Sequence, residues 1–421
     1  MLSVRDALNA LLQSVEPLAP EHVPLLQSVG RVLAEDVSAD LDNPPFDNSA
    51  MDGYAVRAAD VAEASSAHPV VLEALGDVPA GATPAPSVRA GTCVRIMTGA
   101  PTPDGADAVV PLEDVATVGG QVRVLVPAKP GMHVRRRGED YAAGARLVEA
   151  GTTIGPAEVV ALAAAGCAEP LCFRRPTVAL IATGDEIVDP SERPGPGQIR
   201  DTNTFGLAAA CMEAGASVLG MARVPDREDE VERALLSAAG MAGGPAADVI
   251  ISSGGVSVGD RDYIKPVLER IGTLEMWRVA IKPGKPIAVG HIGKSLFFGL
   301  PGNPVSAMVT FEVFVRPVLW KLAGRKELDR PRIRVKLGRL VRHVPGREEY
   351  VRVRLEWREG SFWAEPTGPQ GSGMIRSLLG AHALAVIPAE DGDQPAGTAV
   401  WAMLLSAPAG RGGSSGEGQT P

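Results

Sequence analysis

The chain has 421 residues, of which 45% are hydrophobic and 22% are charged, and its net charge is −9. This length predicts two to four domains, and the acidic balance argues against a nucleic-acid-binding protein. The N-terminal residues show no signal-peptide pattern, and no apolar run is long enough to span a membrane. We therefore expect a cytoplasmic protein with neither a nucleic acid nor a membrane as its partner.

The first third of the chain changes character near residue 46. Residues 3–36 are predicted to be helical, with Ser3 as the cap of the first helix. Prolines at 44 and 45 make the following segment extended. Short strand-like runs then predict a mostly β module over residues 46–140, with strands at 53–56, 92–96 and 121–126. A short alanine-rich helix is expected at 156–166.

The middle of the chain reads as an α/β domain. Apolar runs at 178–182, 249–251 and 296–298 predict parallel strands, and 204–214 and 227–239 are candidate helices. Asp226 is a candidate cap for the second helix. Alternating segments then predict a small β-barrel or sandwich, with strands at 332–337, 350–357 and 361–365. The Gly, Ser and Pro content of 407–421 predicts a disordered tail.

Four polar or glycine-rich turns, most of them directly after an apolar run, are the strongest functional signal. They are Thr183-Gly184-Asp185-Glu186, residues 252–260, Lys282-Pro283-Gly284-Lys285-Pro286 and Leu300-Pro301-Gly302-Asn303-Pro304. In an open parallel sheet such loops line the ligand crevice. Glycine lets the backbone approach a phosphate, helix N-termini favour anions, and carboxylates beside an anion suggest a bridging divalent cation. The turns therefore predict a site for a phosphorylated ligand with a metal.

Cysteine and histidine chemistry is not indicated. Cys93, Cys167, Cys172 and Cys211 show no zinc-site spacing, which favours buried or free thiols. The six histidines form no recognisable pairing with a serine or cysteine nucleophile.

Seven motifs in a fixed order resemble one family. They are Ser49-Ala50-Met51-Asp52-Gly53-Tyr54-Ala55, Ile96-Met97-Thr98-Gly99-Ala100, Arg136-Arg137-Gly138-Glu139-Asp140, Thr183-Gly184-Asp185-Glu186, Ser253-Gly254-Gly255-Val256-Ser257, Lys282-Pro283-Gly284-Lys285-Pro286 and Leu300-Pro301-Gly302-Asn303-Pro304-Val305-Ser306. Together they closely resemble the molybdopterin molybdenumtransferases, the family of the gephyrin E domain. The resemblance runs from about residue 3 to residue 400.

The resemblance implies a multidomain α/β plus β fold with a central parallel-sheet molybdopterin-binding domain. Its expected boundaries are a discontinuous helical linker and dimerisation domain (1–45 and 141–175), a mostly β domain (46–140), the α/β domain (176–326) and a C-terminal β-barrel (327–406). It also implies a homodimer in which the β domain completes the partner's active site. A molybdopterin adenylyltransferase and molybdoenzyme-maturation proteins are further possible partners.

The implied activity is insertion of molybdate into adenylylated molybdopterin with release of AMP, in the presence of Mg²⁺ or Zn²⁺. The implied catalytic residues are Glu186, Asp262, Lys282 and Lys285, and the implied metal ligands are Asp185 and Glu186. The implied ligand-binding residues are Asp52, Thr98, Asp140, Thr183, Gly184, Asp226, Ser253, Gly254, Gly255, Ser257, Arg278, Pro301, Gly302, Asn303, Pro304 and Ser306. Asp260 is a less certain functional acid.

Each motif taken alone has a simpler explanation. Asp185 and Glu186 could cap a helix, the glycine loop could be an ordinary strand-to-helix turn, and the lysine turn could be a solvated basic surface. Two other functions also stay open. The related adenylyltransferases share two of the loops but lack the β modules, and a scaffold protein could bind the ligand without turnover.

Overall fold

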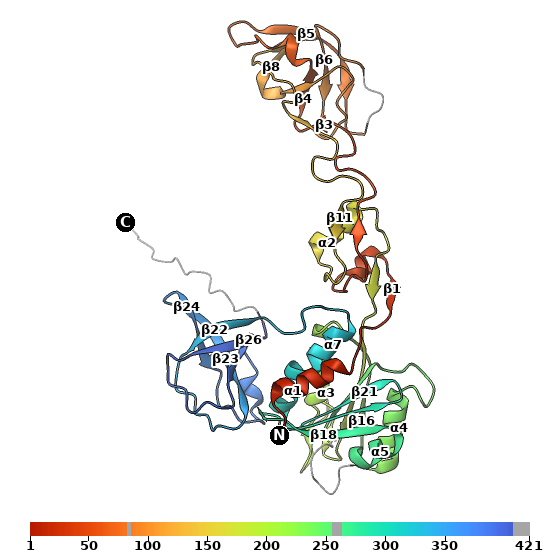
Figure 1. Cartoon of the computed structure of the whole chain (residues 1–421), viewed down its shortest axis with the longest axis vertical. Coiled ribbons are helices and arrows are strands. Elements are labelled where there is room, and N and C mark those ends of the chain that lie inside the picture. The colour runs from red at the N-terminus through yellow and green to blue at the C-terminus, as the bar shows by residue number, and fades with distance from the viewer. Residues whose placement is uncertain (82–85, 255–262, 407–421) are drawn as a thin grey trace.

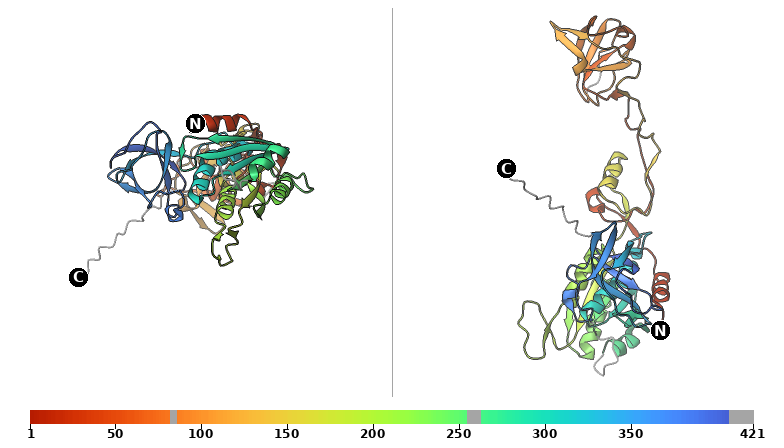
Figure 2. Two further views of the ribbon diagram at one scale, coloured as in Figure 1. Left: turned by 90° about the horizontal axis from the view of Figure 1, so that it is seen from below. Right: turned by 90° about the vertical axis from the view of Figure 1, so that its left-hand side faces the viewer.

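A computed structural model of the chain describes residues 1–81, 86–254 and 263–406. Figure 1 shows an elongated molecule, with a β module at one end and an α/β body beside a β-barrel at the other. A narrow linker separates the two ends, and the right-hand view of Figure 2 shows the same separation from a second direction. The multidomain α/β plus β fold is confirmed.

The α/β body contains a six-stranded sheet in the order β16-β13-β17-β21-β20-β18. Its strands are β13 (Thr177–Thr183), β16 (Ser217–Val224), β17 (Val249–Ser253), β18 (Thr273–Arg278), β20 (Pro286–Ile292) and β21 (Ser295–Leu300). The first four strands in the sheet order run parallel. Three of them, β13, β17 and β21, were predicted from the sequence, and β16 was not. The sheet is nevertheless mixed, because β20 runs antiparallel to both of its neighbours.

Helices cover both faces of this sheet. They are α1 (Val4–Gln13), α3 (Asn203–Glu213), α6 (Pro304–Thr310) and α7 (Arg316–Leu322) on one face, and α4 (Glu228–Ala238) and α5 (Ile264–Ile271) on the other. Helix α1 lies far from the sheet in sequence, but its buried Val4, Ala7 and Leu11 follow the helical repeat and pack into the same core. Ser3 caps α1, accepting a hydrogen bond from Asp6 N at 3.0 Å, as predicted.

Two local predictions were wrong. Most of residues 14–36 is not helical: the segment holds strand β1 (Pro20–His22) and a 3₁₀ turn (Leu25–Ser28). β1 pairs with β12 (Leu171–Phe173), so a tertiary strand partner prevails over local helix propensity. Helix α4 begins after Arg227 rather than after Asp226, so Asp226 is not its N-cap residue.

The linker and the β module are built from short strands. The linker holds β2 (Val37–Ser38), β11 (Arg146–Val148) and helix α2 (Pro156–Ala164), around a small core of its own. The β module holds β3 (Asn48–Ser49), β4 (Gly53–Val56), β5 (Val70–Val78), β6 (Thr92–Ile96), β7 (Ala108–Pro111), β8 (Val115–Val118), β9 (Gln121–Val124) and β10 (Val134–Arg135). Its main sheet has the order β7-β4-β6-β5-β9-β8. The exact domain boundaries given above remain predictions.

The C-terminal strands close a barrel, as expected. The ring runs β23 (Glu348–Arg358), β24 (Ser361–Pro366), β22 (Arg332–Leu337), β26 (Ala399–Leu404) and β25 (Ala383–Ile387), which pairs back with β23. A two-residue strand of the α/β body, β19 (Ile281–Lys282), pairs in parallel with the start of β23. The barrel is therefore joined to the body by backbone hydrogen bonds.

A buried cluster of ion pairs also joins these two parts. Arg316 is 1% exposed and donates to Glu312 at 2.7 and 2.9 Å, while Arg330 donates to the same carboxylate at 2.6 Å. Both arginines also reach Glu213 of α3 at 2.9 Å, and Arg330 donates to the carbonyl of Leu405 at the end of the barrel. Glu312 lies in a π-helical segment (Phe311–Val315) that leads directly into α7.

The four cysteines are free thiols, as predicted, and Cys93, Cys172 and Cys211 are buried. Burial raises the pKa of Cys93 and of Cys211 to about 12. Within the described part of the chain, no helix is both long and apolar enough to cross a membrane.

We expect Glu312→Gln to destabilise the body and barrel strongly, because it removes the buried carboxylate that Arg316 and Arg330 share and leaves them only Glu213, whose side chain is 56% exposed. The expected loss in the free energy of unfolding is about 3–5 kcal/mol. Urea unfolding followed by tryptophan fluorescence measures it, since all five tryptophans lie between residues 277 and 401. The matched control Glu228→Gln breaks the exposed pair with Arg270 and should cost far less. Equal losses in the two variants would contradict this interpretation.

Candidate functional site

The ends of four neighbouring parallel strands bring the predicted loops together. Gly184 N donates to the carbonyl of Val224 at 3.3 Å, and Gly254 N donates to the carbonyl of Leu300 at 3.2 Å. Asn203, the first residue of α3, donates from Nδ2 to Ser253 Oγ and to the carbonyl of Gly302, both at 2.7 Å. The turns that contain Thr183, Ser253 and Gly302 are thus tied into one surface at the carboxyl edge of the sheet.

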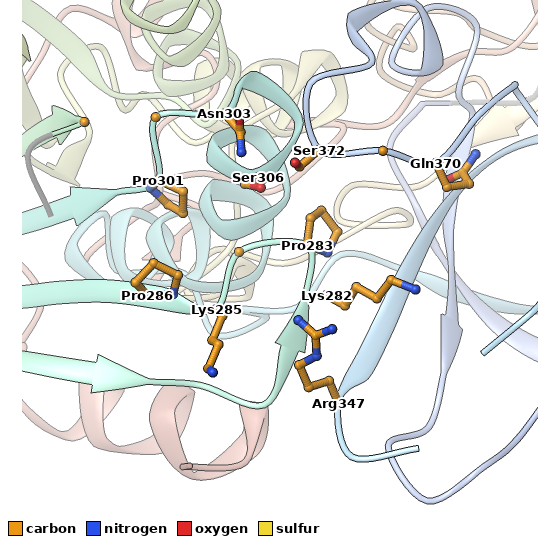
Figure 3. A pocket seen from close by; sticks show the side chains of 14 residues that line it. Lys282, Pro283, Lys285, Pro286, Pro301, Asn303, Ser306, Arg347, Gln370 and Ser372 are labelled. Carbon is orange, nitrogen blue, oxygen red and sulfur yellow. The ribbon is translucent and has the colours of Figure 1, made fainter. Parts of the chain in front are cut away.

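A cavity of about 560 Å³ opens beside these loops, between the α/β body and the barrel. Its lining includes Gly254, Lys282, Gly284, Lys285, Pro301, Gly302, Asn303 and Ser306 from the body, and Arg347, Gln370, Gly371 and Ser372 from the barrel. Figure 3 shows cationic side chains on one side of it and short polar side chains on the other: Lys282, Lys285 and Arg347, and Asn303, Ser306 and Ser372. The cavity is therefore polar and positively charged.

Glycine is required at the tip of the lysine turn. Gly284 has a φ of +111°, and a Cβ atom there would lie 2.4 Å from Thr310 Cγ2 of α6. Such an approach is possible only without a side chain. The turn is consequently pressed against α6, which holds Lys282 and Lys285 at the cavity wall. A solvated surface turn does not need this contact.

The three cations differ in their partners. Among the described residues, neither Lys285 nor Arg347 makes an ion pair or a side-chain hydrogen bond. Lys282 Nζ lies 2.9 Å and 3.0 Å from the two carboxylate oxygens of the buried Glu349. Two cations that face a cavity without a carboxylate partner make a strong anion site, since a bound oxyanion supplies the missing counter-charge.

The barrel's contribution to the cavity was missed from the sequence. Arg347, Gln370 and Ser372 lie more than 40 residues beyond the last recognised motif, Ser306, and enter through the barrel. The sequence does contain a pattern that marks the first of these residues. Arg347 follows Pro345-Gly346 directly, just as Lys285 follows Pro283-Gly284. A cation after a Pro-Gly turn could have marked both residues.

The acidic residues form a second, exposed group near the sheet edge. Asp185 Oδ1 accepts a hydrogen bond from Asp226 N at 3.2 Å, and both Asp185 and Glu186 are exposed. A Cβ atom at Gly184 would lie 2.6 Å from the Glu186 carboxylate, so that side chain folds back over the turn. Gly255, Ser257, Asp260 and Asp262 lie outside the described residues.

Asp185 and Glu186 are the candidate donors for a divalent cation. Within residues 1–81, 86–254 and 263–406, no three His, Cys, Asp or Glu side chains are grouped to hold a metal ion. Two exposed carboxylates nevertheless suit Mg²⁺, which keeps several waters and is typically held by one or two carboxylates plus substrate phosphates. They do not form the closed four-ligand set of a structural zinc site. Asp185 and Glu186 therefore fit Mg²⁺ better.

Three predicted residues lie at the opposite end of the same chain. Asp52 and Thr98 are in the β module, and Asp140 lies where the linker meets it, accepting a hydrogen bond from Asn43 Nδ2 at 2.9 Å. Asp140 lines a separate cavity of about 500 Å³. Figures 1 and 2 show the β module far from the α/β body. One chain alone does not bring these residues to the cationic cavity.

Two further predicted residues lie just outside the cavity. Arg278 ends β18, its side chain is exposed, and its carbonyl accepts a hydrogen bond from Leu2 N at 3.0 Å. Pro304 occupies the first turn of α6, where a missing N–H costs nothing. Neither residue lines the cavity, whereas Ser306, two residues further on, does.

The fold and site define an α/β protein with a cation-lined cavity beside the carboxyl edge of its sheet, and with a barrel closing the other side of that cavity. Sequence profiles identify the parts: the MoeA N-terminal region (domain I and II) matches residues 2–166, the "Probable molybdopterin binding domain" matches 179–321, and the MoeA C-terminal region (domain IV) matches 334–405.

Similar proteins match nearly end to end. A molybdopterin molybdenumtransferase of Haemophilus influenzae is 36% identical over 404 residues, covering 95% of this chain and 98% of the relative. Molybdopterin molybdenumtransferase 2 of Mycobacterium tuberculosis (strain ATCC 25618 / H37Rv) is 39% identical over 406 residues, covering 94% and 98%. The crystal structure of the molybdopterin biosynthesis MoeA protein of Pyrococcus horikoshii OT3 has a TM-score of 0.78 at 30% identity and covers 96% of this chain and 100% of that one. This chain belongs to the molybdopterin molybdenumtransferase family.

We expect the Thr98 side chain to control the acidity of Asp52. The Thr98 backbone N–H and hydroxyl both donate to Asp52 Oδ1 at 2.7 Å, and these bonds hold the pKa of Asp52 below its usual value. Thr98→Val removes only the hydroxyl, so the pKa of Asp52 should rise but stay below that of a free aspartate. Carboxyl ¹³C NMR titration measures this, with the exposed Thr117→Val of β8 as the control. An unchanged Asp52 pKa in Thr98→Val would contradict the bond.

Proposed function

We propose that this chain catalyses the insertion of molybdate into adenylylated molybdopterin, with release of AMP and formation of molybdenum cofactor. The observation that carries the proposal is the cavity in which Lys285 and Arg347 have no carboxylate partner within the described part of the chain. Molybdate is a tetrahedral oxyanion, and a cavity with free cations, hydroxyls and an amide suits it. The full-length similarity to named molybdenumtransferases supports the same assignment.

The residues divide into two groups along the cavity. Lys285 and Arg347 hold the molybdate oxygens, with Ser306 and Ser372 as hydrogen-bonding hydroxyls. Ser253, Gly254 and Gly302 lie where the strand ends meet, and Asn203 fixes their arrangement. Exposed backbone at such a strand-to-helix junction is suited to phosphate. In this proposal the pyrophosphate of the adenylylated substrate lies along the sheet edge. The dithiolene, which receives the molybdenum, faces the cations that hold molybdate.

The acids would serve a divalent cation. Asp185 and Glu186 would hold Mg²⁺, which would supply positive charge beside the substrate phosphates and make the anhydride more reactive. A cation at this place would also explain why two carboxylates lie beside an anion site, because without the cation they would repel the anion. The lysine turn stabilises the negative charge that develops as AMP departs. The dithiolene sulfurs belong to the substrate, so no cysteine of this chain is needed.

A complete site requires a second copy of the chain. Asp52, Thr98 and Asp140 carry the family motifs but lie at the far end of the subunit from the cavity. We infer a homodimer in which the β module of one subunit reaches the α/β body of its partner. The enzyme is proposed to act in the cytoplasm.

Molybdate-dependent AMP release from adenylylated molybdopterin tests the function directly. With Mg²⁺, the wild type should release AMP only when molybdate is added, and Lys285→Gln should need a molybdate concentration about ten- to hundred-fold higher for half-maximal release, because one charge-assisted contact is lost. Lys294→Gln, an exposed lysine in the β20–β21 turn, is the control and should behave as the wild type. AMP release that ignores molybdate would refute the proposal, and pyrophosphate release from ATP would favour an adenylyltransferase.

Mixed dimers test the shared site. Asp52→Ala and Glu186→Ala subunits should each be inactive as homodimers, because every site then lacks one residue. In a heterodimer of the two, one of the two sites contains both intact residues, so activity should return. Tandem purification on two different tags isolates the heterodimer, and AMP release measures its activity. A verified heterodimer without activity would show that each site is built within one subunit.

A further inference from the structure

Lys282 stands at the border of two cavities. Its side chain lines the 560 Å³ cavity described above and also a neighbouring cavity of about 460 Å³, whose other lining residues belong to the barrel. Gln370 and Gly371 line both as well, while Glu349 lines only the second. The ammonium group of Lys282 is paired with Glu349, and Figure 3 shows its side chain extending away from Lys285 toward the barrel.

The carboxylate that holds Lys282 is itself held firmly. The Glu349 side chain is 6% exposed, and its Oε2 lies 2.8 Å from Nδ1 of His343, whose side chain is wholly buried. The backbone N–H of His343 donates to Asp393 at 2.7 Å, which ties this histidine to the barrel. The backbone register pairs Lys282 with Glu349 across β19 and β23. The backbone register and the buried carboxylate therefore set the pair, although the Lys282 side chain itself is 38% exposed.

The pairing changes the charge that the cavity offers to an anion. Three cations line the cavity, but the charge of Lys282 is balanced by a buried carboxylate, while Lys285 and Arg347 have none among the described residues. A buried carboxylate deprived of its partner carries a large desolvation cost. A bound anion therefore competes with Glu349 for Lys282 and does not obtain its full charge.

We propose that Glu349 is a positioning residue that holds Lys282 at the border of the two cavities and thereby lowers the affinity of the cationic cavity for its oxyanion. His343 fixes the Glu349 carboxylate in this role. The inference rests on the proposed function for the identity of the anion, molybdate. As a consequence, the cavity binds the anion with the full charges of Lys285 and Arg347, while the charge of Lys282 stays paired with Glu349.

Glu349→Gln keeps the size of the side chain and removes its charge. We expect this variant to bind molybdate about tenfold more tightly than the wild type, because Lys282 then becomes available as a charge-assisted donor. Equilibrium dialysis of molybdate against the full-length protein measures the dissociation constant without turnover. A merely structural role of Glu349 would weaken binding or leave it unchanged, so a gain excludes that role.

The effect must run through Lys282. In a Lys282→Gln background, adding Glu349→Gln should give no further gain in affinity, and Glu349→Asp, which keeps the charge, should give none in the wild-type background. A gain that persists without Lys282 would show a direct repulsion between Glu349 and the anion, and would overturn the positioning role. A folded Glu349→Gln protein with unchanged or weaker molybdate binding would overturn it as well.

A second comparison does not need a folded Glu349 variant. Because the charge of Lys282 is already paired, Lys282→Gln should weaken molybdate binding much less than Lys285→Gln does. Equal losses would overturn the proposal. Molybdate-dependent AMP release by the wild type, measured in parallel, separates the proposed function from the role of Glu349. If the wild type releases no AMP, the proposed function is refuted. If it does, and Glu349→Gln binds molybdate no more tightly than the wild type, only the role of Glu349 is refuted.

Discussion

The attachment of the barrel to the α/β body is the constraint on which the cavity depends. Neither part encloses the cavity alone: the body supplies the lysine turn and the loops after β21, and the barrel supplies Arg347, Gln370 and Ser372. Their separation is fixed by the backbone pairing of β19 with β23 and by the cluster around Arg316 and Arg330. Since an ion pair of this kind is costly to bury and costly to break, it resists the opening of the cleft.

The register of that pairing also decides the chemistry of the cavity. It sets Ile281 opposite Glu348 and Lys282 opposite Glu349. Successive residues of a strand point to opposite sides, so a slip by one residue would turn the Glu349 side chain away from the lysine. Ile281 is fully buried, which anchors the strand in one register. A core contact thus determines that Lys282 is the paired cation, whereas Lys285 and Arg347 have no carboxylate partner among the residues that the structure describes.

The sequence revealed those parts of the fold that are encoded locally. Apolar runs located β13, β17 and β21, and the motifs after them located the loops, because a strand and its exit turn are neighbours in the chain. The segment after α1 was predicted wrongly because its strand partner, β12, lies about 150 residues away. The cavity residues of the barrel were missed for the same reason: Arg347 lines the same cavity as Lys285 only because of the tertiary fold. The Pro345-Gly346 turn before Arg347 is visible in the sequence, but it does not tell that this arginine lies near the lysine turn. The roles of the acids, including Asp262, stay predictions.

The length of the subunit gives the proposed dimer a physical basis. Two narrow two-stranded pairings, β2 with β11 and β1 with β12, carry the β module away from the body, and the linker core between them is small. Bonds from the Thr98 backbone N–H and hydroxyl, made entirely within that module, hold the pKa of Asp52 below its usual value, so the carboxylate is charged and oriented before any partner arrives. Asp52 lies at the end of a long arm and is already held by its own hydrogen bonds. Placing it in the site of a second subunit therefore costs little free energy, because those bonds need no rearrangement. In the proposed shared site, one subunit contributes the preformed β-module residues and its partner contributes the cationic cavity. Dimer formation only has to bring these two preformed parts together.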